Sequence, residues 1–367
     1  MEKRNNAIDI LKFLFSLLIL IYHAIYVISP DSVKIYPGGG YIGVEFFFVV
    51  SGFLMAHSAF KTAERKNGSL CLGEETVAFL RRKIGTLFPY FAFAYIVSAT
   101  VQIIIYQITG KILIKNLVYS VWEILLLHQS GINVFRWVQG DWYISAMLIG
   151  MLFIYPFLRR YLRTYSYIAA PCVVILYMGY FSKKYGYLHV TGNWNGFVYD
   201  SLIRAFGGMN LGIIVYAVAE RLRNISFTRL GRRLLSVCAC TGYVSIFVTV
   251  FLRSKGAIDF IWLLCIAGSF AITGSGAGSL CRRLNALDSK SFVFLGKYSM
   301  ALYMNHLTCQ HIVKRWFSLW SVEKRIILFC IMGLILAWVC VFCVEYTKIF
   351  WDKYKGHVRR VLLEESR

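Results

Sequence analysis

Three ionisable side chains lie along the first apolar stretch of the chain, and their spacing places them on one face of a helix. Asp9 precedes Lys12 by three residues, and His23 follows Lys12 by eleven. At about 100° and 1.5 Å per residue, Lys12 and His23 share a face and lie roughly 16 Å apart along the helix axis. Ionisable side chains are costly in lipid, so each of the three is a functional candidate.

Two chemical roles suit this face of the helix. A cation near a membrane surface binds anionic groups such as phosphates, and a deeper neutral imidazole accepts a proton from a hydroxyl group. Both side chains also have a structural interpretation. Lys12 can extend to the lipid headgroups, and His23 can pack with its hydrogen bonds satisfied inside a helix bundle. We take His23 as the candidate general base.

A carboxylate, Glu45, lies near the start of the second apolar stretch. If the first two helices form an antiparallel hairpin, Glu45 comes to a depth similar to that of His23. A carboxylate beside an imidazole orients the ring and raises its basicity. We therefore expect Glu45 to hold His23. Ser51 and Gly52 in the same stretch are explained either by substrate contact or by close helix packing, and packing is favoured.

These side chains need a membrane-embedded scaffold. Of the 367 residues, 58% are hydrophobic and 16% are charged, and the mean hydropathy is +0.60. Soluble proteins have about 45–50% apolar and about 25% charged residues. A soluble fold of this size has too little interior to bury so much apolar surface. The composition predicts a polytopic membrane protein and excludes disordered, collagen-like and small disulfide-stabilised proteins.

Ten stretches approach the roughly 20 apolar residues that a transmembrane helix needs, so we expect an all-α bundle of about ten transmembrane helices. The expected spans are 8–29, 39–60, 84–107, 140–158, 164–182, 199–219, 234–252, 258–279, 292–312 and 326–347. Segment 112–130 contains Lys115, Glu123 and His128, which favours an interfacial or re-entrant helix. We expect one membrane domain, 1–352, and a short basic cytoplasmic tail, 353–367.

The distribution of basic residues predicts the orientation. The formal net charge of +22 would suggest nucleic acid as a partner of a soluble protein. Here the basic residues form short clusters between apolar stretches, which is typical of membrane topology. With a cytoplasmic N-terminus, the expected inner loops hold 24 Lys and Arg and the outer loops 12. We therefore expect both termini in the cytoplasm, membrane lipid around the bundle, and no nucleic-acid partner.

The residues above also form a family pattern. Asp9, Lys12 and His23 match an acid, a basic residue, ten residues and a histidine, and Gly43 to Phe53 matches Gly-Val-acid-x-Phe-Phe-x-x-Ser-Gly-Phe. Further matches are the basic run that ends in Pro89, Trp142 with Ser145 and Pro156, Arg204 with Gly212, and the stretch from Leu295 to His306. From residue 7 to about 347 the chain resembles the membrane acyltransferase-3 family, bacterial multi-pass O-acyltransferases that include O-acetylases of cell-surface glycans.

The resemblance implies a reaction and a location. An acyl group, usually acetyl, would pass from acyl-CoA on the cytoplasmic side to a hydroxyl of a cell-envelope glycan or lipid-linked sugar. The donor would be a substrate, with no permanently bound cofactor and no metal. The expected location is the bacterial cytoplasmic membrane. Two positions depart from the family pattern, because Thr86 replaces a second arginine before the proline and Met147 replaces a glutamate that many members carry.

The resemblance also implies roles for particular residues. His23 would be catalytic with Glu45 as its partner. The substrate- and donor-binding candidates are Asp9, Lys12, Arg82, Lys83, Arg204, Ser51, Trp142 and His306. Some of these have structural alternatives. Arg204 either binds substrate or pairs with Asp200, His306 either lines the cavity or packs, and Arg82 is also explained by the ordinary excess of positive charge in cytoplasmic loops.

A transporter or flippase is the main alternative function, because such proteins also bury Lys, Glu, His and Arg. Transporters often show internal repeats and helices broken by Gly or Pro in matching halves. This chain shows no visible repeat and has only five prolines. The sequence therefore favours the enzyme.

Overall fold

The computed structural model describes residues 5–28, 38–66, 70–132 and 134–365. Within these ranges the regular elements are helices, and one isolated bridge joins Trp194 to Tyr199. The helices are α1 (Asn6–Ile28), α2 (Ile42–Arg65), α3 (Leu72–Tyr106), α4 (Gly110–Tyr119), α5 (Val121–Ile124), η1 (His128–Ser130), α6 (Trp142–Arg160), α7 (Leu162–Thr164), η2 (Tyr165–Ala169), α8 (Ala170–Lys184), α9 (Asp200–Arg223), α10 (Arg229–Thr249), α11 (Ile258–Ser275), α12 (Ser279–Ala286), α13 (Lys290–Asn305), α14 (Thr308–Trp316) and α15 (Val322–Glu365).

Eight helical segments among the described residues are long and apolar enough to cross a membrane. They are α1, α2, α3, α6, the run Leu162–Lys184, α9, α11 and α15. A helix suits this solvent because its backbone hydrogen bonds are satisfied within the segment. The protein is thus an all-helical, multi-pass integral membrane protein.

Two of the ten expected spans lie outside this set of eight. Helix α10 covers most of the expected span 234–252, but three of its first five residues are arginines. Helix α13 covers part of 292–312 and has only 16 residues, because the chain turns before α14 begins. The count of about ten spans and the cytoplasmic termini therefore stay predictions.

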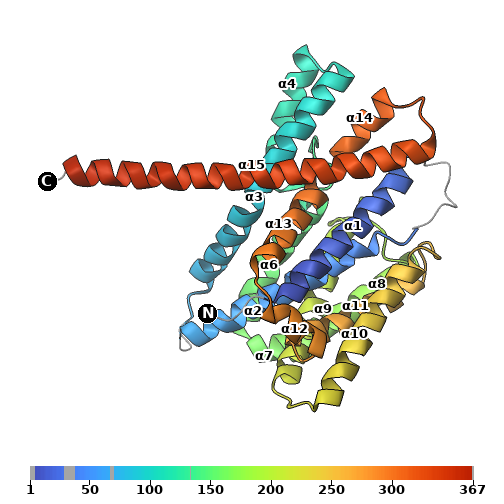
Figure 1. The fold of residues 1–367 in the computed structure, drawn as a ribbon, viewed down its shortest axis with the longest axis vertical. Helices are drawn as coiled ribbons and strands as arrows, with labels where there is room; N and C mark the ends of the chain where they lie inside the picture. Colours follow the sequence, from blue (N-terminus) through green and yellow to red (C-terminus); the bar gives the residue numbers. More distant parts are fainter. Residues whose placement is uncertain (1–4, 29–37, 67–69, 133, 366–367) are drawn as a thin grey trace.

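Segment 112–130 is broken into short helices. It falls in α4, α5 and η1, and the longest of these, α4, has 10 residues. About 20 residues are needed to cross the bilayer. None of the three helices is long enough to add a span, and Figure 1 shows α4 beside the end of α3.

Among the described residues, the most extensive contact between two helices is that of α2 with α9. Gly52 on α2 lies so close to the backbone of Met209 on α9 that a methyl group on its Cα would overlap the Met209 carbonyl oxygen. Small residues allow two membrane helices to approach this closely. The contact fixes Glu45 and Arg204, one on each of these helices, relative to each other.

Helix α1 packs mainly against α13 and also contacts α2 and α15. Figure 1 shows α1, in dark blue, beside α13, in orange, with α15 crossing the bundle and extending past it. The expected tail continues α15 as a helix as far as Glu365. The position of α1 between the other helices allows residues along its length to reach cavities at both of its ends.

Candidate active site

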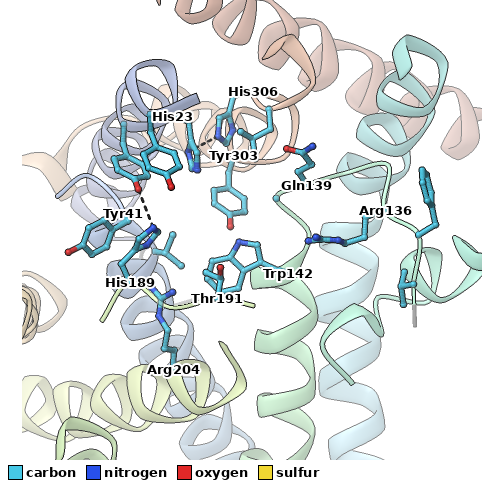
Figure 2. Close-up of a pocket in the computed structure, with 17 residues that line it drawn as sticks. His23, Tyr41, Arg136, Gln139, Trp142, His189, Thr191, Arg204, Tyr303 and His306 are labelled. Carbon is cyan, nitrogen blue, oxygen red and sulfur yellow. Dashed lines mark hydrogen bonds between the residues drawn. The ribbon is translucent and has the colours of Figure 1, made fainter. Parts of the chain in front are cut away.

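A cavity of about 550 Å³ lies at the C-terminal end of α1 (Figure 2). We call it the histidine cavity. Its walls come from the last turns of α1, the start of α2, the loop before α6, the loop before α9, and the ends of α9 and α13 that face it. Its lining includes Tyr22, His23, Tyr41, Trp142, His189, Arg204, Tyr303 and His306.

Two histidines meet at the wall of this cavity. The Nδ1 atom of His23 lies 3.1 Å from Nε2 of His306 and 3.0 Å from the carbonyl oxygen of Ile19. The Nδ1 atom of His306 lies 2.9 Å from the carbonyl oxygen of Leu302. His306 is 1% exposed, whereas His23 keeps partial exposure. The fold therefore brings together two histidines that the sequence separates by most of the chain.

The backbone carbonyl groups determine which ring nitrogens carry protons. A carbonyl oxygen only accepts, so Nδ1–H of His306 donates to Leu302, and its Nε2 becomes an acceptor. Nδ1–H of His23 then donates to that Nε2 and to Ile19. A neutral His23 with its proton on Nδ1 keeps a lone pair on Nε2. The pair therefore leaves His23 with one basic nitrogen that no residue in the described ranges occupies.

The expected contact between Glu45 and His23 is replaced by a buried ion pair. Glu45 Oε1 lies 2.6 Å from Nη2 and 2.8 Å from Nε of Arg204, and both side chains are fully buried. The hydroxyl of Tyr177 donates to the other carboxylate oxygen of Glu45 at 3.2 Å. The orientation of α2 about its own axis points Glu45 toward α9 and away from α1. The partner of His23 is His306 instead.

Arg204 reaches the histidine cavity from α9. Its Nη1 donates to the carbonyl oxygen of Val190 at 2.9 Å, and its guanidinium lies 5.3 Å from the centre of a Trp142 ring. The alternative pairing with Asp200 does not form. Asp200 instead accepts hydrogen bonds from Tyr180, at 2.6 Å, and Tyr185. Arg204 thus brings a positive charge to the wall of the cavity, while its partner Glu45 is not part of the cavity lining.

A second group of polar side chains lines the same cavity. These residues were not predicted from the sequence as part of the site. The Tyr22 hydroxyl lies 3.2 Å from Nε2 of His189, whose ring stacks on Tyr41 at a centroid distance of 4.3 Å. Tyr41 donates to Asp259 at 2.7 Å. Burial, then the charges of Arg204 and Lys255, lower the pKa of His189 to about 3. His189 is therefore neutral at pH 7.

A separate cavity of about 420 Å³ lies at the opposite, N-terminal end of α1. We call it the lysine cavity. It is lined by Asp9 and Lys12, which pair at 3.6 Å, and by His57, Lys61 and Arg223. The predicted acid and base on α1 thus do share a face, and they share a cavity with basic residues from two other helices.

The remaining predicted donor residues lie near the lysine cavity. A further cavity, of about 670 Å³, shares His57 and Lys61 with it and is lined by Arg82. Lys83 lines neither cavity, and its ammonium lies 5.8 Å from the centre of the Phe79 ring. His57 and Lys61 were not predicted, although their spacing of four residues places both on one face of α2.

Ser51 belongs to the packing between α2 and α6. Its hydroxyl lies 3.0 Å from the Tyr143 hydroxyl and donates to the sulfur of Met147 at 3.2 Å. Ser51 is absent from the walls of both the histidine and the lysine cavities. The structure thus places it as the packing interpretation expects.

Comparison with known proteins decides the family. A family model described as an acyltransferase domain matches residues 5–345, almost the whole chain. The chain belongs to the acyltransferase-3 family. No curated protein and no solved structure matches it.

The geometry of this membrane acyltransferase suits proton transfer from a hydroxyl group. Of the predicted residues, His23, Trp142, Arg204 and His306 line the histidine cavity, and Asp9 and Lys12 line the lysine cavity. On α1, the rise per residue was sufficient to separate His23 from Asp9 and Lys12. No periodic signal could have found His189, because it lies in the loop between α8 and α9.

Proposed function

We propose that this acyltransferase moves an acyl group, most often acetyl, from acyl-CoA to a hydroxyl of a cell-envelope glycan or lipid-linked sugar. The His23–His306 pair carries the proposal, because it leaves a basic nitrogen at the wall of a cavity large enough for a sugar. Activation of a hydroxyl by a positioned base is a common form of acyl-transfer catalysis.

The lysine cavity supports acyl-CoA as the donor. Coenzyme A carries several phosphates, and this cavity and its neighbour bring together Lys12, Lys61, Arg82 and Arg223. Charge-assisted hydrogen bonds from such groups to phosphate are among the stronger polar interactions. The excess of basic residues in the loops at this end favours the cytoplasm, which is where acyl-CoA is made available.

The histidine cavity supports a sugar acceptor. Tyr22, Tyr303 and Trp142 give its walls aromatic faces together with hydroxyl and N–H groups. Aromatic side chains of this kind combine an apolar surface with a polar end. A sugar ring has the same two properties, with C–H groups on its faces and hydroxyl groups at its edge.

In the proposed reaction, the acceptor hydroxyl oxygen attacks the thioester carbonyl carbon while Nε2 of His23 takes the hydroxyl proton. The new C–O bond forms, the C–S bond breaks, and the proton passes to the thiolate to give free CoA. The imidazolium formed meanwhile donates through Nδ1 to His306 and Ile19. The acyl group must approach His23 from the lysine cavity, roughly 16 Å along α1, so the pantetheine arm of the donor would enter the bundle.

The experiment is transfer in inverted membrane vesicles supplied with acetyl-labelled acetyl-CoA. We expect label in glycan or lipid-linked sugar with the wild-type protein and, at equal expression, at least about 100-fold less with His23→Ala. The matched control is His311→Ala, because His311 lies on α14 outside both cavities and contacts Tyr106. A transporter or flippase would leave the label on CoA in all three vesicle preparations, which would refute the proposal.

A further inference from the structure

Five arginines converge on a cavity of about 670 Å³ that neither the donor nor the acceptor site uses. They come from the start of α10 and from the short helix α12, and Ser279 completes the lining. The arginines are Arg229, Arg232, Arg233, Arg282 and Arg283. Figure 1 shows α12 beside α10, and Asn6 at the start of α1 donates through Nδ2 to the carbonyl oxygen of Leu284 on α12, at 2.9 Å.

These guanidinium groups lack acidic partners within the described ranges. The hydrogen bond that they form there is from Nε of Arg232 to the carbonyl oxygen of Phe227, at 3.0 Å, and no carboxylate pairs with any of the five. Like charges held around one cavity repel each other. The usual excess of basic residues at one membrane face explains their side of the membrane, but it does not explain why they converge.

An apolar groove of about 410 Å³ adjoins the arginine cluster. It lies between α1, α10, α11 and α12, and among its lining residues are Leu14, Val244 and Phe247. On α10 this surface is open, since Val244 is 59% and Val248 is 52% exposed. Covering an open apolar surface with hydrocarbon is favourable, so the groove suits an acyl chain.

The cluster and the groove meet at one pair of serines. The hydroxyl of Ser236, in the groove wall, lies 3.2 Å from that of Ser279, in the wall of the arginine cavity. The amide of Leu280 also donates to Ser236 at 3.0 Å. A single molecule with an anionic head and hydrocarbon tails could therefore occupy both spaces across this contact.

We propose that the arginine cluster and the adjoining groove bind an anionic diacyl phospholipid. The phosphate lies among the arginines, where several charge-assisted hydrogen bonds are available, and an acyl chain lies along α1 and α10. Basic pockets between membrane helices at this face are suited to acidic lipid headgroups. This site is separate from acyl transfer and does not depend on the proposed function. It would hold α1, the helix that bears His23, against α10.

The test is native mass spectrometry of the full-length protein in mild detergent, titrated with phosphatidylglycerol or with phosphatidylcholine of the same chains. We expect retention of phosphatidylglycerol and weaker retention of phosphatidylcholine by the wild type. In Arg232→Gln/Arg233→Gln/Arg283→Gln, affinity for phosphatidylglycerol should fall about 100-fold. The matched control, Lys183→Gln/Lys314→Gln/Arg315→Gln, removes three exposed charges elsewhere and should leave it unchanged.

Two further measurements distinguish binding of a lipid from binding of a soluble phosphate compound. Val244→Trp fills the groove without touching an arginine and should weaken retention of phosphatidylglycerol about tenfold. Coenzyme A and inorganic phosphate, added as competitors, should leave the bound lipid in place. The proposal would be overturned if the wild type retained the two lipids equally, or if the arginine and control variants lost the same affinity for phosphatidylglycerol. It would also be overturned if Val244→Trp retained phosphatidylglycerol as the wild type does, or if coenzyme A displaced the bound lipid.

Discussion

The histidine pair is positioned by backbone carbonyl groups and not by a carboxylate. In α1 and directly after α13, Nδ1 of each ring lies within 3.0 Å of the carbonyl oxygen four residues earlier, at Ile19 and Leu302. This local bond fixes each ring on its own helix. Because carbonyl oxygens only accept, it also fixes the tautomer of the pair. A carboxylate beside His23 is therefore unnecessary for its orientation.

The first prediction concerns the two histidines. His23→Ala should lower kcat by about 10²–10⁴-fold, the usual contribution of a positioned base. His306→Gln should lower kcat less, because the amide oxygen of glutamine can accept from Nδ1 of His23. The measurement is steady-state transfer with both donor and acceptor varied. If His306→Gln is inactive while His23→Ala is near wild type, His306 is the base.

The second prediction concerns Glu45 and Arg204. Because both are fully buried, removal of one charge leaves the other unpaired. Glu45→Gln or Arg204→Gln alone should lower the free energy of unfolding by about 3–5 kcal/mol. The double variant should recover part of the loss, since no uncompensated charge then remains. Unfolding in a denaturing-detergent titration checks this, and strictly additive losses would contradict the pairing.

The sequence named these residues as candidates but did not predict how they pair. Residue spacing within α1 fixed the relation of Asp9, Lys12 and His23, because a helix has a known rotation per residue. The rotation of α2 relative to α1 has no such rule when apolar residues surround the whole helix. Glu45 was therefore predicted beside His23, whereas it pairs with Arg204.

At the scale of the helices, close contact between α2 and α9 holds the buried ion pair. Apolar runs in the sequence located both helices, but the closeness of their backbones depends on Gly52 and Gly212 meeting the facing helix. From the sequence, close helix packing was the favoured role of Gly52. Which helix it faces was not visible, since α9 is far along the chain.

The third prediction is that Gly52→Ala destabilises the protein. Its new methyl group would overlap the Met209 carbonyl oxygen, and overpacking of this kind costs on the order of 1–3 kcal/mol. Gly85→Ala on α3 is the control, because nothing lies within 4 Å of its new methyl group. That change should be neutral or stabilise the helix by about 0.5–1 kcal/mol. Thermal unfolding in detergent compares the two, and equal melting temperatures would exclude the close contact.

The loop before α6, which lines the histidine cavity, is held by a buried carboxyl group on α5. Glu123 accepts hydrogen bonds from the amides of Trp137, at 2.9 Å, and Val138, at 2.7 Å. Burial, then the charge of Asp141, raise the pKa of Glu123 from 4.5 to about 8, against the lowering effect of these two amides. The sequence marked Glu123 as out of place in a span, which led to the interfacial assignment.

The fourth prediction is a pH dependence of stability that comes from Glu123. The unfolded chain releases this proton near pH 4.5, whereas the folded protein holds it to about pH 8. Between these values the folded state binds more protons, so stability falls as pH rises and levels off above about 8. Glu123→Gln removes the titration and should flatten that decline. Unfolding measured from pH 5 to 9 tests it, and parallel curves for the two proteins would exclude Glu123 as the source.

At the scale of the molecule, one helix connects two cavities of different chemistry. The lysine cavity at the N-terminal end of α1 collects basic side chains, and the histidine cavity at the other end collects aromatic rings and imidazoles. Composition and loop charges predicted the membrane class, and motifs predicted the family. The residues that line the cavities were harder to predict from the sequence. Loop residues such as His189 and α2 residues such as Lys61 reach the cavities only through the packing of the bundle.

The last prediction is that donor and acceptor binding separate along α1. Lys12→Ala should weaken acyl-CoA binding by about 1–3 kcal/mol, the value of a hydrogen bond to a charged group, and leave acceptor binding unchanged. Lys183→Ala, an exposed lysine at the far end of α8, removes the same charge and should change neither. Donor affinity measured in inverted and right-side-out vesicles adds the sidedness, because only inverted vesicles expose the lysine cavity if the N-terminus is cytoplasmic. Equal binding of acyl-CoA to both vesicle types, or equal losses in the two lysine variants, would show that bulk charge and not this cavity attracts the donor.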